Sequence, residues 1–94
     1  MSETTIFRLR IKGDVQGVGF RDWAIREAGA RGLSGWVRNR SDGSLEMLIA
    51  GPDQTIKDML AAVTQGPPLA RVHNIDIHNE TELPPAGFGR KPTL

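Results

Sequence analysis

Within residues 6–12, hydrophobic and basic residues alternate from Phe7 to Lys12. The apolar face of this segment consists of Phe7, Leu9 and Ile11. Such a period of two predicts a half-buried strand. From Phe20 onward the spacing of apolar residues becomes helical, and Gly32 is a natural stop. The first third of the chain therefore predicts a strand followed by a helix.

The middle of the chain predicts a hairpin and a second helix. Residues 33–39 and 45–50 are short strand-like segments, and the Asp42-Gly43 pair between them is typical of a tight turn. Gly51-Pro52-Asp53 opens a helix, because proline suits the first helical position. An apolar stripe of helical spacing follows, formed by Ile56, Met59, Leu60 and Val63. Gly66-Pro67-Pro68 ends this helix.

Residues 72–80 predict a fourth strand, and residues 83–94 form a Pro/Gly-rich tail that can add at most a short edge strand. The resulting order of elements is that of a ferredoxin-like βαββαβ sandwich, an α+β fold. We expect an antiparallel four-stranded sheet of order 4-1-3-2, with a possible short fifth edge strand. Two helices are expected to cover one face of this sheet.

The composition fits one domain over residues 1–94, with residues 1–5 expected to be a flexible N-terminus. A net charge of +1 argues against a non-specific binder of nucleic acid or acidic membranes. The chain has no cysteine, no secretory signal and no stretch able to span a bilayer. We expect a cytoplasmic protein, and a monomer, because no spare apolar stripe remains once both helices cover the sheet.

Residues 13–21, with the sequence GDVQGVGFR, join the first strand to the first helix. Glycines let backbone N–H groups converge on one point, and a helix start adds unpaired N–H groups and a positive dipole end. Arg21 supplies a planar fork of donors that matches phosphate oxygens. These nine residues alone fit an anion-binding loop and a glycine-rich turn with a surface arginine about equally well.

A right-handed crossover makes the first two strands parallel, with the third strand between them. Their ends then lie on one edge of the sheet, roughly 10 Å apart. Asn39, at the end of the second strand, is therefore expected to reach an anion held by residues 13–21.

Other motifs are less convincing. The glycine-rich loop lacks the Lys-Ser/Thr of a P-loop and the third glycine of a dinucleotide fingerprint. RNA-recognition domains share the βαββαβ order, but the third strand here has no aromatic residue for base stacking. His73 and His78 should point to opposite faces of their strand, which argues against a shared metal site. We expect Trp23 and Trp36 in the core, and acidic residues such as Glu46 at edges and surfaces without paired-carboxylate chemistry.

Residues 13–21, together with Gly35-Trp36-Val37-Arg38-Asn39 and Asp42-Gly43, resemble the acylphosphatase family over nearly the whole chain. The resemblance implies a hydrolase that cleaves small acyl phosphates to a carboxylate and inorganic phosphate without a metal or cofactor. It implies that Arg21 grips the phosphate and that Asn39 positions the attacking water. The phosphate-binding set that it implies is Gln16, Gly17, Val18, Gly19, Phe20 and Arg21.

Two features depart from the family pattern. Asp14 places a carboxylate beside the anion loop, where related chains often carry a basic or neutral residue. Phe88 is the only aromatic residue in the closing strand. The main alternative is a non-hydrolytic module that binds phosphate or carbamoyl phosphate, and a regulatory or RNA-binding domain on the same fold comes third.

Overall fold

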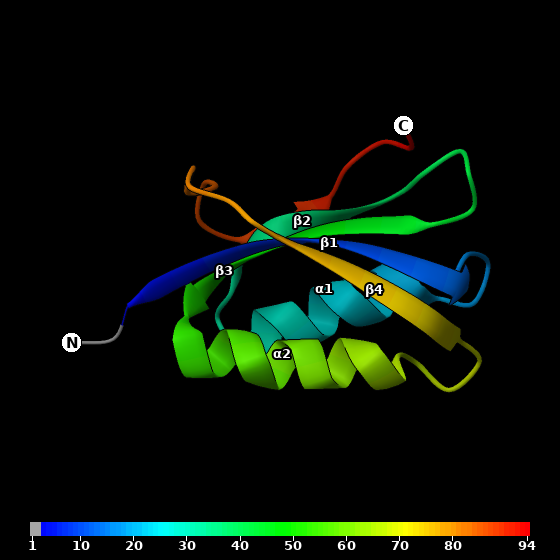
Figure 1. Cartoon of the computed structure of the whole chain (residues 1–94), viewed down its shortest axis with the longest axis horizontal. Coiled ribbons are helices and arrows are strands. Elements are labelled where there is room, and N and C mark those ends of the chain that lie inside the picture. Colours follow the sequence, from blue (N-terminus) through cyan, green and yellow to red (C-terminus); the bar gives the residue numbers. More distant parts are fainter. Residues whose placement is uncertain (1–2) are drawn as a thin grey trace.

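The computed structural model describes residues 3–94 as one sheet with two helices packed on it (Figure 1). The elements are β1 (Thr4–Asp14), α1 (Phe20–Ala30), β2 (Ser34–Asn39), β3 (Leu45–Pro52), α2 (Asp53–Gln65), β4 (Arg71–Asn79) and β5 (Phe88–Arg90). Within this range neither helix is long and apolar enough to cross a membrane.

The strand order is β4-β1-β3-β2-β5, so the predicted 4-1-3-2 order is confirmed and the fifth strand is present. The first four strands pair antiparallel, whereas β5 pairs parallel with β2, which makes the sheet mixed. Both helices lie on the same face, and the other face is open (Figure 1). The predicted ferredoxin-like α+β sandwich is confirmed.

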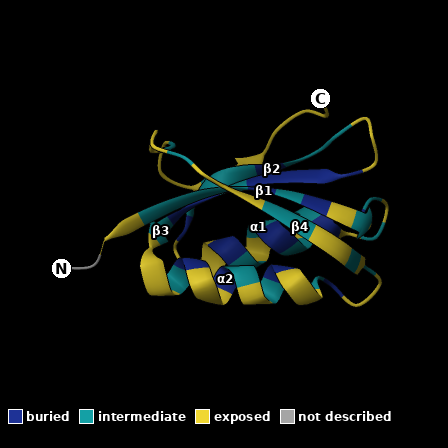
Figure 2. Cartoon of the chain, viewed as in Figure 1, coloured by how far each residue is buried: buried dark blue, intermediate teal, exposed yellow. Residues whose placement is uncertain are grey.

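The core fills the space between the sheet and the helices (Figure 2). Alternate residues of β1, β2 and β3 are fully buried there, and they meet the apolar stripes of both helices. These buried residues include Leu9, Ile11, Val37, Met47, Ile49, Ala24, Ala28, Ile56, Met59 and Val63. The alternation seen in the sequence thus places one face of each strand against the helices.

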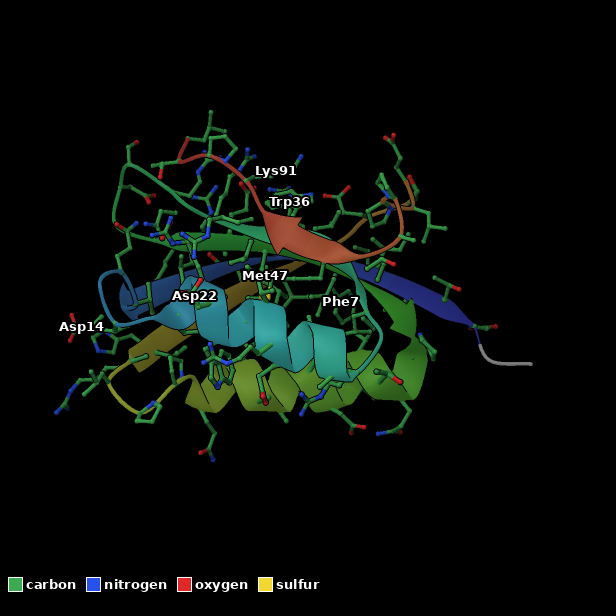
Figure 3. All side chains as sticks on the ribbon, turned by 180° about the vertical axis from the view of Figure 1, so that it is seen from behind. Phe7, Asp14, Asp22, Trp36, Met47 and Lys91 are labelled. Atoms are coloured by element: carbon green, nitrogen blue, oxygen red, sulfur yellow. The ribbon has the colours of Figure 1, made fainter. Side chains whose placement is uncertain are left out.

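Trp23 packs against this core, as expected, but the core assignment of Trp36 is wrong. Trp36 lies on the open face of the sheet, on the side opposite the helices (Figure 3). The Arg38 guanidinium and the Lys91 ammonium each lie 4.7 Å from the centroid of its ring. The reason is the strand period: the neighbouring Val37 points into the core, so Trp36 must point away from it.

The expected flexible N-terminus is also corrected where the structure describes it. Thr4 and Thr5 belong to β1 and pair with Pro52 and Gly51, because β3 extends far enough to offer them partners. The Thr5 hydroxyl also donates to Asp53 Oδ1 at 3.0 Å. Residues 1–2 of that prediction lie outside the described residues.

Candidate active site

The site begins where β1 ends. The pairing of β1 with β4 shifts between Lys12 and Gly13, and Gly13 has a φ of 137°. A Cβ atom at this position would lie 2.1 Å from the main-chain oxygen of Arg71. Only glycine fits here, because the two backbones approach too closely for any side chain. This close contact fixes the point from which the following loop leaves the sheet.

Gly17 and Gly19 give the loop its shape. Both are left-handed, with φ values of 74° and 79°, and a Cβ atom on either would meet nothing within 4 Å. Gly19 is the N-cap of α1 and provides no side-chain hydrogen bond to the helix start. The first N–H groups of α1 therefore have no side-chain cap, which leaves them available to an anion at the positive end of the helix dipole.

Gln16 uses its side chain for another purpose. Its Nε2 donates to the main-chain oxygens of Arg40 at 2.8 Å and Ser44 at 2.9 Å, in the turn between β2 and β3. The side chain is thus committed to that turn, and only the backbone N–H of Gln16 remains for an anion.

Asn39 ends β2 opposite Leu45 of β3. Within the described part of the chain, its Oδ1 is buried and accepts no hydrogen bond. A buried acceptor without a donor is costly and uncommon in a folded protein, so it points to a functional constraint.

The turn after Asn39 is held by Asp42 Oδ1, which accepts from the Ser44 N–H at 2.9 Å and the Ser44 hydroxyl at 2.6 Å.

A cavity of about 120 Å³ connects these elements. Its lining residues are Val15, Gly17, Gly19, Phe20, Arg21, Asp22, Asn39 and Arg90. The fold thus brings Arg21 and Asn39 together, as the strand topology predicts. Of the predicted phosphate-binding residues, Gln16 and Val18 lie outside this lining, and the Val18 side chain packs against the core. Arg21 is half-buried and has no carboxylate partner among residues 3–94.

Asp22 and Arg90 also line the cavity, and the sequence analysis assigned neither to the site. Arg90 Nη2 donates to Asp22 Oδ1 in an ion pair between β5 and the first turn of α1. The spacing from Phe88, which packs on the core, places Arg90 on the same face of β5. The sequence alone could not show this, because it depends on the pairing of β5 with β2.

Asp14 does not disturb the site. Its side chain is exposed and points away from the molecule (Figure 3). A carboxylate in this position is well solvated and adds little repulsion to an anion inside the cavity.

A larger hollow of about 460 Å³ lies on the open face of the sheet and shares no lining residue with the loop cavity. Its wall includes Trp36, Leu48 and the tail at Leu83. The arginine in this wall, Arg8, is already bound to Glu80 at 2.7 Å. The smaller cavity, with its converging N–H groups, is the better candidate for anion chemistry.

Comparison with known proteins agrees with this geometry. The sequence model of the acylphosphatase family matches residues 7–89. The chain belongs to the acylphosphatase family. An acylphosphatase of Rhizorhabdus wittichii is 45% identical over 87 residues, which cover 93% of this chain and 88% of the relative. The crystal structure of acylphosphatase from Bacillus subtilis superposes with a TM-score of 0.88 at 36% identity, covering 93% of this chain and 98% of that one.

These matches confirm the predicted family and its function, the hydrolysis of acyl phosphates. A structure of full-length HypF in a phosphate- and nucleotide-bound form has a TM-score of 0.87, but at 24% identity this likeness concerns the fold alone. It covers 99% of this chain and 12% of HypF. Nothing in the comparisons favours the non-hydrolytic alternative.

Proposed function

We propose that this acylphosphatase binds the phosphoryl group of its substrate in the cavity between the loop of residues 15–19, Arg21 and Asn39. The observation that carries the proposal is the buried Oδ1 of Asn39, which has no hydrogen-bond partner among residues 3–94 and belongs to a residue that lines the same cavity as the uncapped start of α1. The loop and Arg21 supply donors for an anion, and Asn39 supplies an acceptor for a water molecule.

The phosphoryl oxygens are bound by backbone N–H groups of residues 16–20 and by the guanidinium of Arg21. Phosphoryl transfer depends mainly on positioning and on stabilising charge on the equatorial oxygens. Fixed donors aimed at such a charge contribute about 3–4 kcal/mol each to lowering a barrier. Arg21 is suited to this role because no carboxylate among residues 3–94 competes for its guanidinium.

Asn39 orients the attacking water. Its amide is neutral and therefore a poor base, but its oxygen can accept a hydrogen bond from water while its nitrogen donates one. We infer that a phosphoryl oxygen of the substrate takes the proton of that water. The leaving group is a carboxylate of low pKa, so that a general acid is not required.

The unpaired oxygen of Asn39 also weighs against the non-hydrolytic module. A carbonyl oxygen directed at a bound anion repels it, so a site built only to hold phosphate has no use for a buried acceptor. With a water between the acceptor and the phosphoryl group, the same atom stabilises the reacting complex.

The decisive assay measures phosphate release from acetyl or benzoyl phosphate in the presence of a chelator. We expect the wild type to turn over the substrate and Arg21→Ala to lose activity while keeping its circular dichroism spectrum. Arg26→Ala is the matched control, because Arg26 is an exposed arginine of the same helix. Full activity of Arg21→Ala would refute the mechanism, and phosphate binding without turnover by the wild type would favour the non-hydrolytic module.

We further propose that the protein acts as a cytoplasmic monomer without a nucleic-acid partner. The large apolar side chains that are exposed, such as Leu69 and Leu83, come from separate segments of the chain. Sedimentation equilibrium at several concentrations tests the monomer directly, and a mass that rises to twice the chain mass would overturn it.

A further inference from the structure

The Asp22–Arg90 ion pair lies at the rim of the active site. Both residues line the cavity that holds Arg21 and Asn39. Their side chains are 66% and 43% exposed, respectively. Figure 3 shows Asp22 at the start of α1. The established activity and the proposed mechanism assign no task to this pair.

The backbone that carries Arg90 is held in place by β2 and by the core. β5 runs parallel to β2, with Arg90 paired to Val37, and the Lys91 N–H donates to the Val37 oxygen at 2.9 Å. Phe88, two residues before Arg90, packs against the core. The backbone of Arg90 is therefore held on both sides, and its guanidinium reaches α1 across the edge of the cavity.

The residues that line the cavity differ in how deeply they are buried, and their expected roles differ accordingly. The Asn39 Oδ1 is buried and Arg21 is half-buried, whereas Arg90 is exposed at the rim. A phosphoryl group seated on the loop and Arg21 therefore lies deeper than Arg90. The part of the substrate that projects outward from this seat is the acyl group, and this is the part that Arg90 can meet.

We propose that Arg90 is a specificity-determining residue that binds a second carboxylate on the acyl group of the substrate. The preferred substrates are then acyl phosphates of dicarboxylic acids. The inference rests on the proposed phosphoryl site. A guanidinium–carboxylate contact is the one that Arg90 already makes with Asp22, and an ion pair this exposed is weak. A substrate carboxylate can therefore replace Asp22 at little cost.

The test compares kcat/KM for succinoyl phosphate with kcat/KM for butyryl phosphate. Both acyl groups have four carbons, and only the first carries a second carboxylate. We expect the ratio of the two values to fall about threefold in Arg90→Gln, because one solvent-exposed charge-assisted contact is lost. Asp22→Asn removes the competing carboxylate and should raise the ratio. Arg26→Gln, an equal change of charge elsewhere on the surface, should leave the ratio as in the wild type.

An unchanged ratio in Arg90→Gln would overturn the inference, and so would an Asp22→Asn ratio that does not rise. Arg90→Lys is a second variant in case the glutamine variant misfolds. It keeps the positive charge but lacks the planar guanidinium. Its kcat/KM ratio should lie between those of the wild type and Arg90→Gln. Failure of the proposed phosphoryl site gives a different result, since Arg21→Ala would then keep full activity on butyryl phosphate.

Discussion

Gln16 donates a 2.8 Å hydrogen bond from its Nε2 to the main-chain oxygen of Arg40, the residue that follows Asn39. The same nitrogen donates to the Ser44 oxygen at 2.9 Å. One side chain therefore ties the loop before α1 to the segment that carries Asn39, the residue that we propose orients the attacking water. The two halves of the proposed active site follow different strands, and this contact links them directly.

Replacing Gln16 by alanine is expected to lower kcat more than phosphate affinity. The backbone N–H of residue 16 survives the change, but the Asn39 segment is no longer fixed against the loop. We expect kcat to fall about tenfold, and the inhibition constant of inorganic phosphate to change by less than about threefold, because small errors in placing reactants are costly. Gln65→Ala, at an exposed position, is the control. Equal losses in both constants would show that Gln16 acts in binding.

The Asn39→Ala variant should lose catalytic activity without losing stability. We expect kcat to fall on the order of a hundredfold or more, because the attacking water is no longer oriented. The free energy of unfolding should not decrease, because the substitution removes a buried acceptor that has no donor in the described part of the chain. Urea denaturation and phosphate inhibition check both points, with Asn79→Ala as the exposed control. A collapse of phosphate affinity would assign Asn39 to binding instead.

The order of elements and the position of the glycine-rich loop before α1 could be predicted because their signals are local. Alternation over residues 6–12 and the Asp42-Gly43 turn reflect the backbone conformations that these residues favour. The meeting of Arg21 with Asn39 followed from the handedness of the crossover, which places the ends of β1 and β2 on one edge of the sheet.

The features that the sequence did not predict depend on the pairing register between strands that lie far apart in the sequence. The partnership of Arg90 with Asp22 appears only when β5 is paired with β2. Trp36 is different, because its outward position already followed from the alternation around Gly35 and Val37. A large aromatic residue was assigned to the core on its size, and the strand period decides otherwise.

Glu46 is the clearest case of a missed register effect. The sequence suggested a carboxylate at an edge or surface, but its side chain is 4% exposed in the middle of the open face. It accepts hydrogen bonds from Arg38 at 2.7 Å, Arg40 at 3.1 Å and Arg8 at 3.3 Å. Arg8 and Arg38 come from the two strands that flank β3, so the cluster exists only when the sheet is assembled.

These contacts make a prediction about acid stability. Burial raises the pKa of Glu46, but the hydrogen bond and charge of Arg38, with help from Arg8 and Arg40, outweigh burial and lower it below the ordinary 4.5. A lowered folded pKa means that the charged form stabilises the protein above pH 4.5, and that this contribution is lost as the pH falls through the folded value.

We therefore expect Glu46→Gln to cost about 2 kcal/mol of unfolding free energy at neutral pH, less than for a fully buried pair because the arginines are partly solvated. The difference from wild type should shrink as the pH falls below 4.5. Urea denaturation at a series of pH values measures it, with Glu82→Gln as the exposed control. A difference that stays constant down to acid unfolding would mean that the Glu46 charge is not the source of the stability.

The central claim is that the loop before α1 binds the phosphoryl group through its backbone N–H groups beside Arg21. Its most direct test is a titration of the ¹⁵N-labelled protein with inorganic phosphate, followed by amide chemical shifts. We expect the largest shifts at residues 16–21 in the wild type, and their loss in Arg21→Ala. Largest shifts on the open face around Trp36, with residues 16–21 unmoved, would contradict the account.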